Sequence, residues 1–588
     1  MIGVSYIAKA APAGGAALGQ TIGATAGALV ISAAMVAIVA GHRRGSLPQV
    51  GRIAAFAERV SGIPGWASFP LAFVAGALAV AVFGMYWDIA IHIDKGRDPG
   101  PLANAAHYFI LAGLFGIFFA GLLSVALPLS GRPSRSAIKV VGDWYAPLGG
   151  VLMVVSASFA LGAFPMDDAW HRLFGQDVTL WGPTHLLLIG GAGLATVGGL
   201  ILLAEGVSAR ADERRRPPFL LGRRAATTGG FLLALSTFQA EFDYAVPQFR
   251  LVWHPILLML AAGIGLVTAR IVIGRGGALM ALALYLLIRG LLSLYVGPIT
   301  GHTTLHFPLY VVEALVVEAV ALAADPERGI PFGALAGAGI GVFGLAAEWG
   351  WSHIWWTIPW TNALLPEGVI AGFLAAVSGG VIGGFIGSCL RQRQVQPRWA
   401  PALAAAVIVG LFVFALQMNG GPGTRATVTL HDLTPPPKRT VSATMKLDPP
   451  DAADDAEWFT ATAWQGGGSV VDRLKKVGPG TYRTTKAIPV YDNWKSTLRL
   501  QKGATVAGLP IFMPADSAIP VKEIPARSHF TRTFVRDKKN LQREQKTGVS
   551  PALTVIAYLI VLGVFTGLIA ALAWGLRRFA RSEALVTH

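Results

Sequence analysis

The sequence predicts an all-α polytopic membrane protein with about thirteen transmembrane helices and a small extracytoplasmic β-sandwich domain before the last helix. Its 588 residues are 53% hydrophobic and only 14% charged, whereas soluble proteins carry about 25% charged residues. Apolar runs of about 20 residues, the length that crosses a bilayer, recur from Ile22 to Leu576. A long polar stretch before the last run alternates in the way that is typical of strands.

The predicted spans define the domain organisation. An N-terminal helix and a cytoplasmic linker occupy residues 1–68, and five helix hairpins with outward tips occupy 69–390. A twelfth helix lies in 391–418, the β-sandwich and a basic arm in 419–549, and the C-terminal helix and cytoplasmic tail in 550–588. The expected runs lie near 22–41, 69–93, 105–128, 145–167, 184–205, 225–243, 251–273, 277–297, 306–324, 330–350, 366–390, 401–418 and 550–576.

Charge in the connecting loops predicts the orientation. One set of loops is rich in arginine, whereas the other set holds most of the histidines. By the positive-inside rule the arginine-rich set is cytoplasmic. We therefore expect an integral protein of the bacterial cytoplasmic membrane, with its N-terminus outside and its C-terminus inside. The net charge of +16 lies largely in these loops, so the expected partner is the lipid membrane and not nucleic acid. The oligomeric state stays open, with a homo-oligomer as one option.

The polar stretch between Met418 and Val549 predicts a β-sandwich of about 100 residues on the outer face. Glycine-rich turns at Gly466–Gly468 and Gly478–Gly480 separate the short alternating runs. The stretch ends in the Lys/Arg-rich segment Arg527–Lys546, for which we expect the role of an arm over the lipid surface or neighbouring subunits. The expected strands are Ala426–Leu430, Thr440–Leu447, Glu457–Trp464, Thr481–Ile488 and Ser496–Leu500.

A cluster of ionisable residues occurs twice, each time between two apolar runs. Both copies read D-x3-H-x3-G-x-D, followed after seven or eight residues by a histidine and six positions later by a glycine, Gly113 or Gly191. Carboxylates and imidazoles at a membrane boundary are expensive to desolvate, so a duplicated set of them indicates a function. The copies are Asp88, His92, Gly96, Asp98 and His107, and Asp167, His171, Gly175, Asp177 and His185.

The spacing predicts that the polar side chains of each copy meet. An Asp and a His four positions apart share one face of a helix, and the glycine can end that helix. The last histidine opens the next helix and faces back toward the first. The predicted metal ligands are Asp88, His92 and His107 in one site and Asp167, His171 and His185 in the other, with Asp98 and Asp177 as further ligands or as partners that orient an imidazole.

Two imidazoles and a carboxylate suit Cu(II), Zn(II) or non-haem Fe(II). Haem suits them less, because its axial histidines usually lie within helices, whereas these lie at helix ends beside carboxylates. An alternative without metal stays open: Asp and His at helix ends also cap helices or pair with cations, and Lys95, Arg97 and Arg172 are available. One copy, moreover, need not hold a metal.

Several other residues are weaker candidates. Asp168, His254, His302, His306, Glu348 and His353 are predicted as additional ligands or supporting partners. Trp351, Trp355 and Trp356 lie in an aromatic stretch that is typical either of an interfacial belt or of a wall along an apolar substrate path. Arg289, Glu313 and Glu318 fall within apolar runs, where a buried structural ion pair is the favoured interpretation over a relay.

The duplicated motif resembles the metal motif in the C subunit of particulate methane and ammonia monooxygenases. That family has Asp, His and His in a D-x3-H-x12-H pattern, whereas the two copies here place fourteen and thirteen residues between the histidines. The resemblance covers about twenty residues per copy and implies copper and monooxygenation. Separately, Gly480–Leu500, with Tyr482, Pro489 and Trp494, resembles extracytoplasmic β-domains of FixH/YtkA type, which implies a link to copper handling and cytochrome oxidase maturation.

These observations favour a membrane metalloprotein that binds copper at its extracytoplasmic face, with zinc and iron as alternatives. One hypothesis is an oxidoreductase of the copper membrane monooxygenase kind that acts on a small apolar substrate; whether the chain is an enzyme stays open. The alternatives are a metal transporter, a copper-delivery factor for respiratory enzymes, or an assembly protein that binds partners through its β-domain. A zinc-dependent membrane hydrolase is a further option, although the sequence lacks a Ser-x3-His element.

Overall fold

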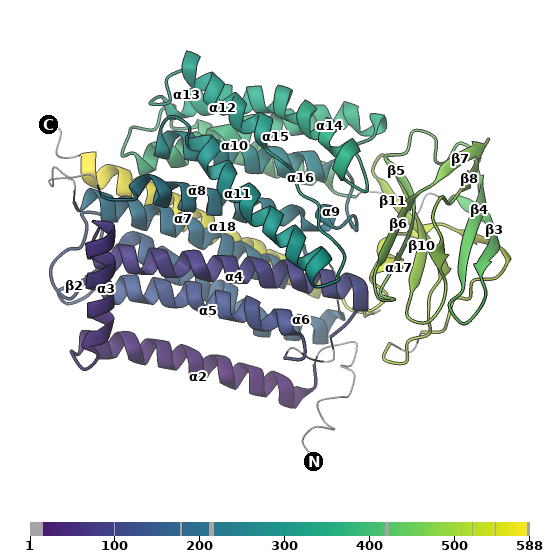
Figure 1. Cartoon of the computed structure of the whole chain (residues 1–588), viewed down its shortest axis with the longest axis horizontal. Helices are drawn as coiled ribbons and strands as arrows, with labels where there is room; N and C mark the ends of the chain where they lie inside the picture. The colour runs from purple at the N-terminus through teal and green to yellow at the C-terminus, as the bar shows by residue number, and fades with distance from the viewer. Residues whose placement is uncertain are drawn as a thin grey trace.

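The computed structural model describes residues 16–98, 100, 102–176, 179–210, 217–417, 423–519, 521–546 and 548–584. Long helices lie side by side in a bundle, and a domain of β-strands covers one end of that bundle (Figure 1). The predicted class, a polytopic helical membrane protein with a β-domain, is confirmed.

Within the described residues, ten helical segments are long and apolar enough to cross a membrane. Each coincides with a run that the sequence predicts. They are α2 (Leu18–Arg43), α4 (Gly65–Lys95), α5 (Ala105–Ala126), α6 (Leu148–Phe174), α7 (Pro183–Ser208), α10 (Trp253–Ile273), α11 (Gly277–Leu294) continued by the π-helical turn η2 (Tyr295–Ile299), α13 (Gly329–Gly339) continued through the π-helical turn η3 (Ile340–Gly344) into α14 (Leu345–Trp355), α15 (Leu365–Leu390) preceded by the short turn η4 (Asn362–Leu364), and α18 (Pro551–Ala584).

The other three predicted runs correspond to shorter helices. The helix expected at 225–243 is α8 (Leu220–Ser236), followed by a 3-10 turn, η1 (Thr237–Gln239), and α9 (Ala240–Asp243). The run 306–324 begins with non-helical backbone up to Tyr310 and becomes helical only as α12 (Val311–Ala323). The run 401–418 is α16 (Ala400–Ala415). The structure therefore supports the thirteen apolar runs as helices but not the length of each as a full span.

The end of the bundle opposite the β-domain carries a helix that the sequence did not predict. Helix α3 (Pro48–Ser61) runs across the ends of its long neighbours (Figure 1). Its Ile53, Phe56 and Val60 are exposed, which is typical of an amphipathic helix in the membrane interface. A small hairpin, β1 (Ile138–Val141) and β2 (Trp144–Ala146), lies at the same end.

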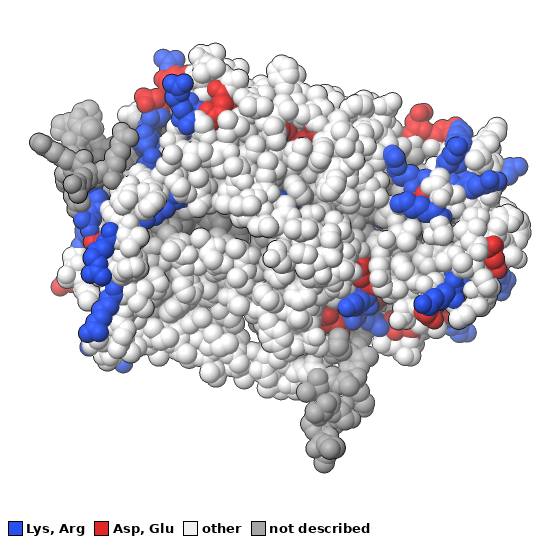
Figure 2. All heavy atoms as spheres, in the orientation of Figure 1, with Lys and Arg blue, Asp and Glu red and all other residues white. Residues whose placement is uncertain are grey.

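Charge on the visible face follows the same division. Figure 2 shows lysine and arginine at the end near α3 and over the β-domain, whereas the long face of the helices between them is nearly free of charged side chains. An uncharged band between two charged ends is what a bilayer requires of the surface that contacts its hydrocarbon core.

The β-domain is a sandwich of two antiparallel sheets. One sheet has the order β13-β11-β10-β5-β6 and the other β12-β3-β4-β8-β7, with β9 paired to β4. Side chains from both sheets, among them Met445 and Leu498, share one core. The strands are β3 (Arg425–Thr434), β4 (Thr440–Asp448), β5 (Trp458–Trp464), β6 (Ser469–Arg473), β7 (Lys475–Gly478), β8 (Thr481–Arg483), β9 (Ile488–Pro489), β10 (Lys495–Lys502), β11 (Thr505–Phe512), β12 (His529–Thr533) and β13 (Val535–Arg536), followed by the short helix α17 (Lys538–Leu541).

Two helix pairs, α4 with α5 and α6 with α7, repeat the same close contact. A Cβ on Gly113 would lie 2.6 Å from the backbone nitrogen of Ala81, and a Cβ on Gly191 would lie 3.0 Å from that of Ala160. Ala81 and Ala160 both lie seven residues before the first Asp of their motif. Small residues at such a contact let helix backbones approach closely in lipid, so each pair brings the end of one helix to the start of the next in the same way.

Candidate metal centre

The first cluster forms where α4 ends and α5 begins. Asp88 and His92 lie one turn apart near the end of α4. Gly96 then ends the helix with a φ of +85°, a conformation that suits glycine because it has no Cβ. The chain turns back through Asp98, and His107 lies in the first turn of α5. The predicted convergence of a helix end and a helix start is observed.

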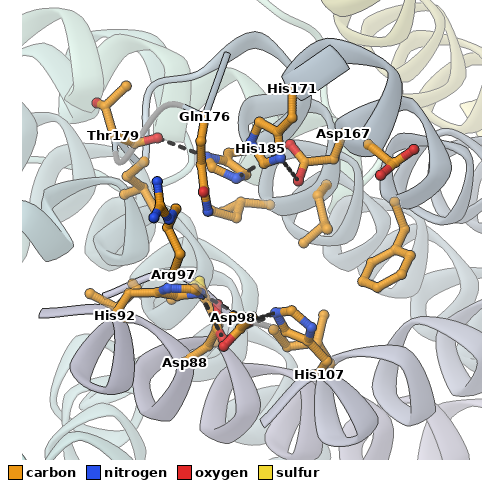
Figure 3. A pocket seen from close by; sticks show the side chains of 18 of the residues that line it. Asp88, His92, Arg97, Asp98, His107, Asp167, His171, Gln176, Thr179 and His185 are labelled. Atoms are coloured by element: carbon orange, nitrogen blue, oxygen red, sulfur yellow. Dashed lines mark hydrogen bonds and ion pairs between the residues drawn. The ribbon is translucent and has the colours of Figure 1, made fainter. Parts of the chain in front are cut away.

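Four donor atoms of this cluster face one another (Figure 3). The Nε2 of His92 lies 3.4 Å from Asp88 Oδ1 and 3.4 Å from Asp98 Oδ2. The Nε2 of His107 lies 3.2 Å and 3.4 Å from the same two oxygens. Four ligands about 2.1 Å from a metal in a tetrahedron are separated by roughly 3.4 Å. The four nitrogen–oxygen distances therefore match those of a four-coordinate site, and all four donor atoms lie within 4.8 Å of one another.

The second cluster repeats this arrangement with fewer described members. Asp167 and His171 lie one turn apart at the end of α6, and Gly175 ends the helix with a φ of +82°. Asp167 Oδ1 lies 3.4 Å from His185 Nε2, and Asp167 Oδ2 lies 3.8 Å from His171 Nδ1. The two histidine rings are 6.5 Å apart, against 6.3 Å in the first cluster. Asp177, the predicted counterpart of Asp98, lies outside the described residues.

Hydrogen bonds to backbone carbonyls fix the protonation of one histidine in each cluster. The Nδ1 of His92 lies 2.9 Å from Gly96 O, and the Nδ1 of His185 lies 2.7 Å from Thr179 O. A carbonyl only accepts, so Nδ1 donates in both rings. In the neutral ring Nε2 would then turn its lone pair toward a carboxylate oxygen, which is repulsive. A cation between Nε2 and the oxygen, either a second proton on the ring or a metal ion, removes this repulsion.

The guanidinium groups near the motif do not neutralise the cluster carboxylates. Arg97 Nη2 lies 2.8 Å from Asp516 Oδ2 in the β-domain. Arg172 Nε lies 2.7 Å from Asp168 Oδ2, and its Nη2 donates to Ala16 O at 2.6 Å. Pairing of these arginines with Asp88, Asp98 or Asp167, the simplest alternative to a cation site, is therefore not what the structure shows.

Both clusters line one cavity of about 470 Å³. In Figure 3 they lie on facing walls, with Arg97 and Gln176 at one side of the gap. The His107 ring packs edge-on against Phe164 of α6 at 5.8 Å, so the two helix pairs are in direct contact. Away from the clusters the walls are mainly apolar side chains of α2, α5 and α6, such as Leu29, Phe115 and Leu161. The cavity thus connects the two polar clusters to an apolar space between the helices.

The β-domain lines one end of the cavity and caps both cluster helices. The backbone amides of Gln465 and Gly467 donate to Ile93 O and Asp94 O at the end of α4, each at 2.9 Å. The amide of Lys546 donates to Phe174 O at the end of α6 at 2.8 Å. The last carbonyls of a helix have no partner within it, so the β-domain satisfies them in both repeats.

Electrostatics reinforce this docking at the edge of the first cluster. Burial disfavours the charged form of Asp516, but the Arg97 guanidinium outweighs burial and holds the pKa of that carboxyl below its usual value. The pair joins the loop after α4 to the β-domain next to Asp98.

The weaker histidine and acid candidates do not join either cluster. Asp168 is held by Arg172 and by the backbone amide of Ala16. His302 Nδ1 lies 2.9 Å from Asp94 Oδ2, and His306 receives no cluster contact but lies against Trp355. The others are placed as follows: His254 accepts from Trp360 Nε1, Glu348 accepts from the amides of Leu309 and Tyr310, and His353 lies 2.8 Å from Trp349 O.

The predicted aromatic wall lies apart from the clusters. Trp351 donates its indole N–H to Phe307 O and stacks with Trp355, while Trp356 packs edge-on against His254. None of these three tryptophans is among the described residues that line the cavity between the clusters. A substrate path along them stays a prediction.

Sequence reasoning missed the polar neighbours that hold the ligands. Asn104 Nδ2 donates to Asp88 Oδ1 at 2.5 Å and to Asp98 Oδ2 at 3.1 Å. Thr184 Oγ1 donates to Asp167 Oδ1 at 2.6 Å. Glu241 accepts from Thr179 Oγ1 and so supports the carbonyl that orients His185. Only Asn104 gave a signal, as a helix-capping residue type just before the apolar run of α5.

Searches of family models, curated proteins and solved structures find no match to this chain. The resemblances to the monooxygenase C subunit and to FixH/YtkA-type domains therefore remain proposals, and what the chain can do has to be argued from its own residues.

Proposed function

We propose that the protein is a membrane metalloprotein that binds copper in the two clusters at the β-domain end of α4–α7. The observation that carries the proposal is the donor geometry of the first cluster: each of two imidazole nitrogens lies 3.2–3.4 Å from the same two carboxylate oxygens. The ring orientation set by Gly96 O supports it, because metal-binding histidines commonly donate their other N–H to a carbonyl.

Copper is the proposed metal because the donors are imidazole and carboxylate without thiolate. Such nitrogen–oxygen sets bind Cu(II) more tightly than the other divalent first-row metals. The resemblance to the monooxygenase motif points the same way. Zinc and iron accept the same ligands, so metal analysis decides among the three.

We further propose an oxidoreductase of the copper membrane monooxygenase kind. The cavity supports this function, because both clusters border a space with apolar walls into which a small apolar molecule fits. In this scheme copper supplies the redox chemistry, and the chain holds the substrate beside the clusters. The β-domain and the helix ends that it caps border that end of the cavity.

A copper-delivery role is the second candidate, and one observation favours it. The clusters lie directly beneath a docked β-domain, which offers a route for handing metal to a partner at the membrane surface. Oxygen-dependent turnover of small hydrocarbons or ammonia by the metal-loaded protein supports the enzyme, whereas metal transfer without turnover supports the carrier.

Metal content of the purified full-length protein tests the shared premise. We expect stoichiometric copper in the wild type, loss of the first site in His92→Ala and loss of the second in His171→Ala. His353→Ala is the matched control, because that ring lies outside both clusters and contacts a backbone carbonyl. A wild type that stays metal-free after mild purification and copper reconstitution contradicts the proposal.

A further inference from the structure

A second group of ionisable side chains lies buried among the helices, apart from the metal clusters. Glu313 in α12 is fully buried, and Glu348 in α14 is 2% exposed. Glu313 lies against Gly344, which is one helical turn before Glu348, so the two carboxyl groups are neighbours. Arg289, a buried cation of the same helical region, forms an ion pair with Asp243. Among the described residues, no cation is paired with either carboxyl group.

Hydrogen bonds distinguish the two acids. Glu348 Oε1 accepts from the backbone amides of Leu309 and Tyr310, each at 2.9 Å. Among the described residues, neither oxygen of Glu313 has a hydrogen-bond partner of normal geometry, and Glu348 Oε2 has none. The phenol oxygen of Tyr310 is likewise buried without a partner in the described structure. Three side chains with unsatisfied polar atoms are thus buried in this region.

The backbone around the pair can compensate one negative charge but not two. The two amide donors stabilise a carboxylate on Glu348. Glu313 lies in the first turn of α12, where the helix dipole also favours negative charge. Two adjacent carboxylates at membrane depth would remain strongly repulsive, so a proton on one of them is the simplest way to neutralise the excess charge.

The local helix geometry is built around Glu313. The π-helical turn η3 passes directly beside it, and a Cβ on Gly344 would lie 2.5 Å from Glu313 Cγ. Such turns inside helices are frequent at functional sites. The non-helical backbone before α12 supplies the two amides that donate hydrogen bonds to Glu348. Interrupted helices supply backbone groups to bound ions in membrane proteins in a similar way.

We propose that Glu313 and Glu348 form a proton-binding site inside the membrane domain, with the proton held on Glu313 and the negative charge on Glu348. This site is separate from the metal clusters and does not depend on the function proposed for them. The step balances with water as the only other reactant: a Glu313 carboxylate oxygen gains the proton, and water supplies it on binding and accepts it on release.

Buried contacts lead from this site toward the first cluster. The rings of Tyr310 and Tyr285 are 5.2 Å apart, and Arg289 follows one turn after Tyr285 on α11. Arg289 pairs with Asp243, whose Oδ2 accepts from Tyr86 Oη at 3.2 Å. Tyr86 lies on α4, two residues before the first cluster aspartate. A series of buried neighbours, of which Arg289, Asp243 and Tyr86 are joined by polar contacts, therefore runs from the proton site to the helix that carries the metal ligands.

Infrared spectroscopy of the full-length protein tests the proposal. At about pH 8, well above the ordinary glutamate pKa of about 4.3, we expect a carbonyl band from a protonated carboxyl in a dry environment. The band should shift in D2O and disappear in Glu313→Gln. The band should weaken in Glu348→Gln, because removing the neighbouring negative charge makes a charged Glu313 easier to accommodate.

Glu318→Gln is the matched control, since Glu318 lies on the same helix but pairs with Arg270 at 2.9 Å; its band should equal that of the wild type. Should Glu313→Gln fail to fold, 13C labelling of glutamate carboxyls in the wild type replaces it, and the band must then shift. A band that remains in Glu313→Gln, or that does not shift on 13C labelling, overturns the proposal. A band that disappears when sodium is added also overturns it, because the site would then bind sodium instead of a proton.

Discussion

The ligands of both clusters depend on neutral polar side chains that fix each carboxylate. In the first cluster one amide group, on Asn104, bridges Asp88 and Asp98. In the second a hydroxyl, on Thr184, holds Asp167. Each donor keeps a carboxylate oxygen directed at an imidazole nitrogen. Comparison of the two motif copies could not reveal these partners, because different residue types at different positions of the two copies hold the carboxylates.

Replacing Asn104 with alanine should weaken metal binding in the first cluster by about 10–100-fold, the usual effect of losing a partner that orients a ligand. The same change removes the cap of α5, where Asn104 Oδ1 accepts from Ala106 N, and so should cost about 1 kcal/mol of stability. Chelator competition measures the first effect and thermal unfolding the second. Asn104→Ser separates them, because serine keeps the cap but is too short to bridge both carboxylates.

Thr184→Val should weaken the second cluster and leave the first unchanged, since valine keeps the shape of threonine but cannot donate to Asp167. Metal titration of Thr184→Val in the His92→Ala background reads the second site alone. Equal loss from both sites in the single variant would show that the clusters act as one centre.

Among elements, the glycine contacts between paired helices set the geometry of both clusters. Gly113→Ala places a Cβ 2.6 Å from the Ala81 nitrogen of α4, and backbone cannot yield as a side chain does. We expect the helices to separate and stability to fall by about 1–3 kcal/mol. Gly76→Ala in α4 is the control, because nothing lies within 4 Å of its Cβ; helix propensity then favours alanine. In thermal unfolding measured in detergent, Gly113→Ala should lower the midpoint temperature of unfolding, whereas Gly76→Ala should not.

Sequence pattern predicted elements well where a single physical requirement dominates. The length of the apolar runs located the long helices. Gly96 and Gly175 marked the ends of α4 and α6, because the backbone has a positive φ at each of these glycines. The non-helical backbone before Tyr310 was not predicted, since its apolar residues satisfy the same hydropathy pattern as a helix. What keeps it open is a tertiary contact, the Glu348 carboxylate that accepts its amides.

At the scale of the whole molecule, the β-domain is attached to the membrane helices by specific hydrogen bonds and lines the cavity between the clusters. Its backbone caps α4 and α6, and Arg499 donates to Asp537 and to Pro247 O between α9 and α10. Strand alternation predicted the sandwich itself. It could not predict the docking, because Gln465 meets the end of α4 across about 370 residues of sequence, a contact that no local pattern encodes.

Glu457 makes this docking sensitive to pH. It lies just before β5 at the interface, where its backbone carbonyl accepts from Thr361 and its carboxyl accepts from Gly503 N. Burial raises the pKa of Glu457 to about 7 from the ordinary value of 4.5. Between these values the folded protein keeps a proton that the unfolded chain loses, so stability should fall as pH rises from 4.5 to about 7 and level off above.

Thermal unfolding of the full-length protein across this window measures the slope, and Glu457→Gln should flatten it, because the amide mimics the protonated acid at every pH. Asp454→Asn is the control on the same domain. Its hydrogen bond from Lys476 lowers the pKa of that carboxyl, so it titrates below the window and its removal should leave the slope intact. A slope that persists in Glu457→Gln would assign the pH sensitivity to another group, and the β-domain would then dock independently of this buried acid.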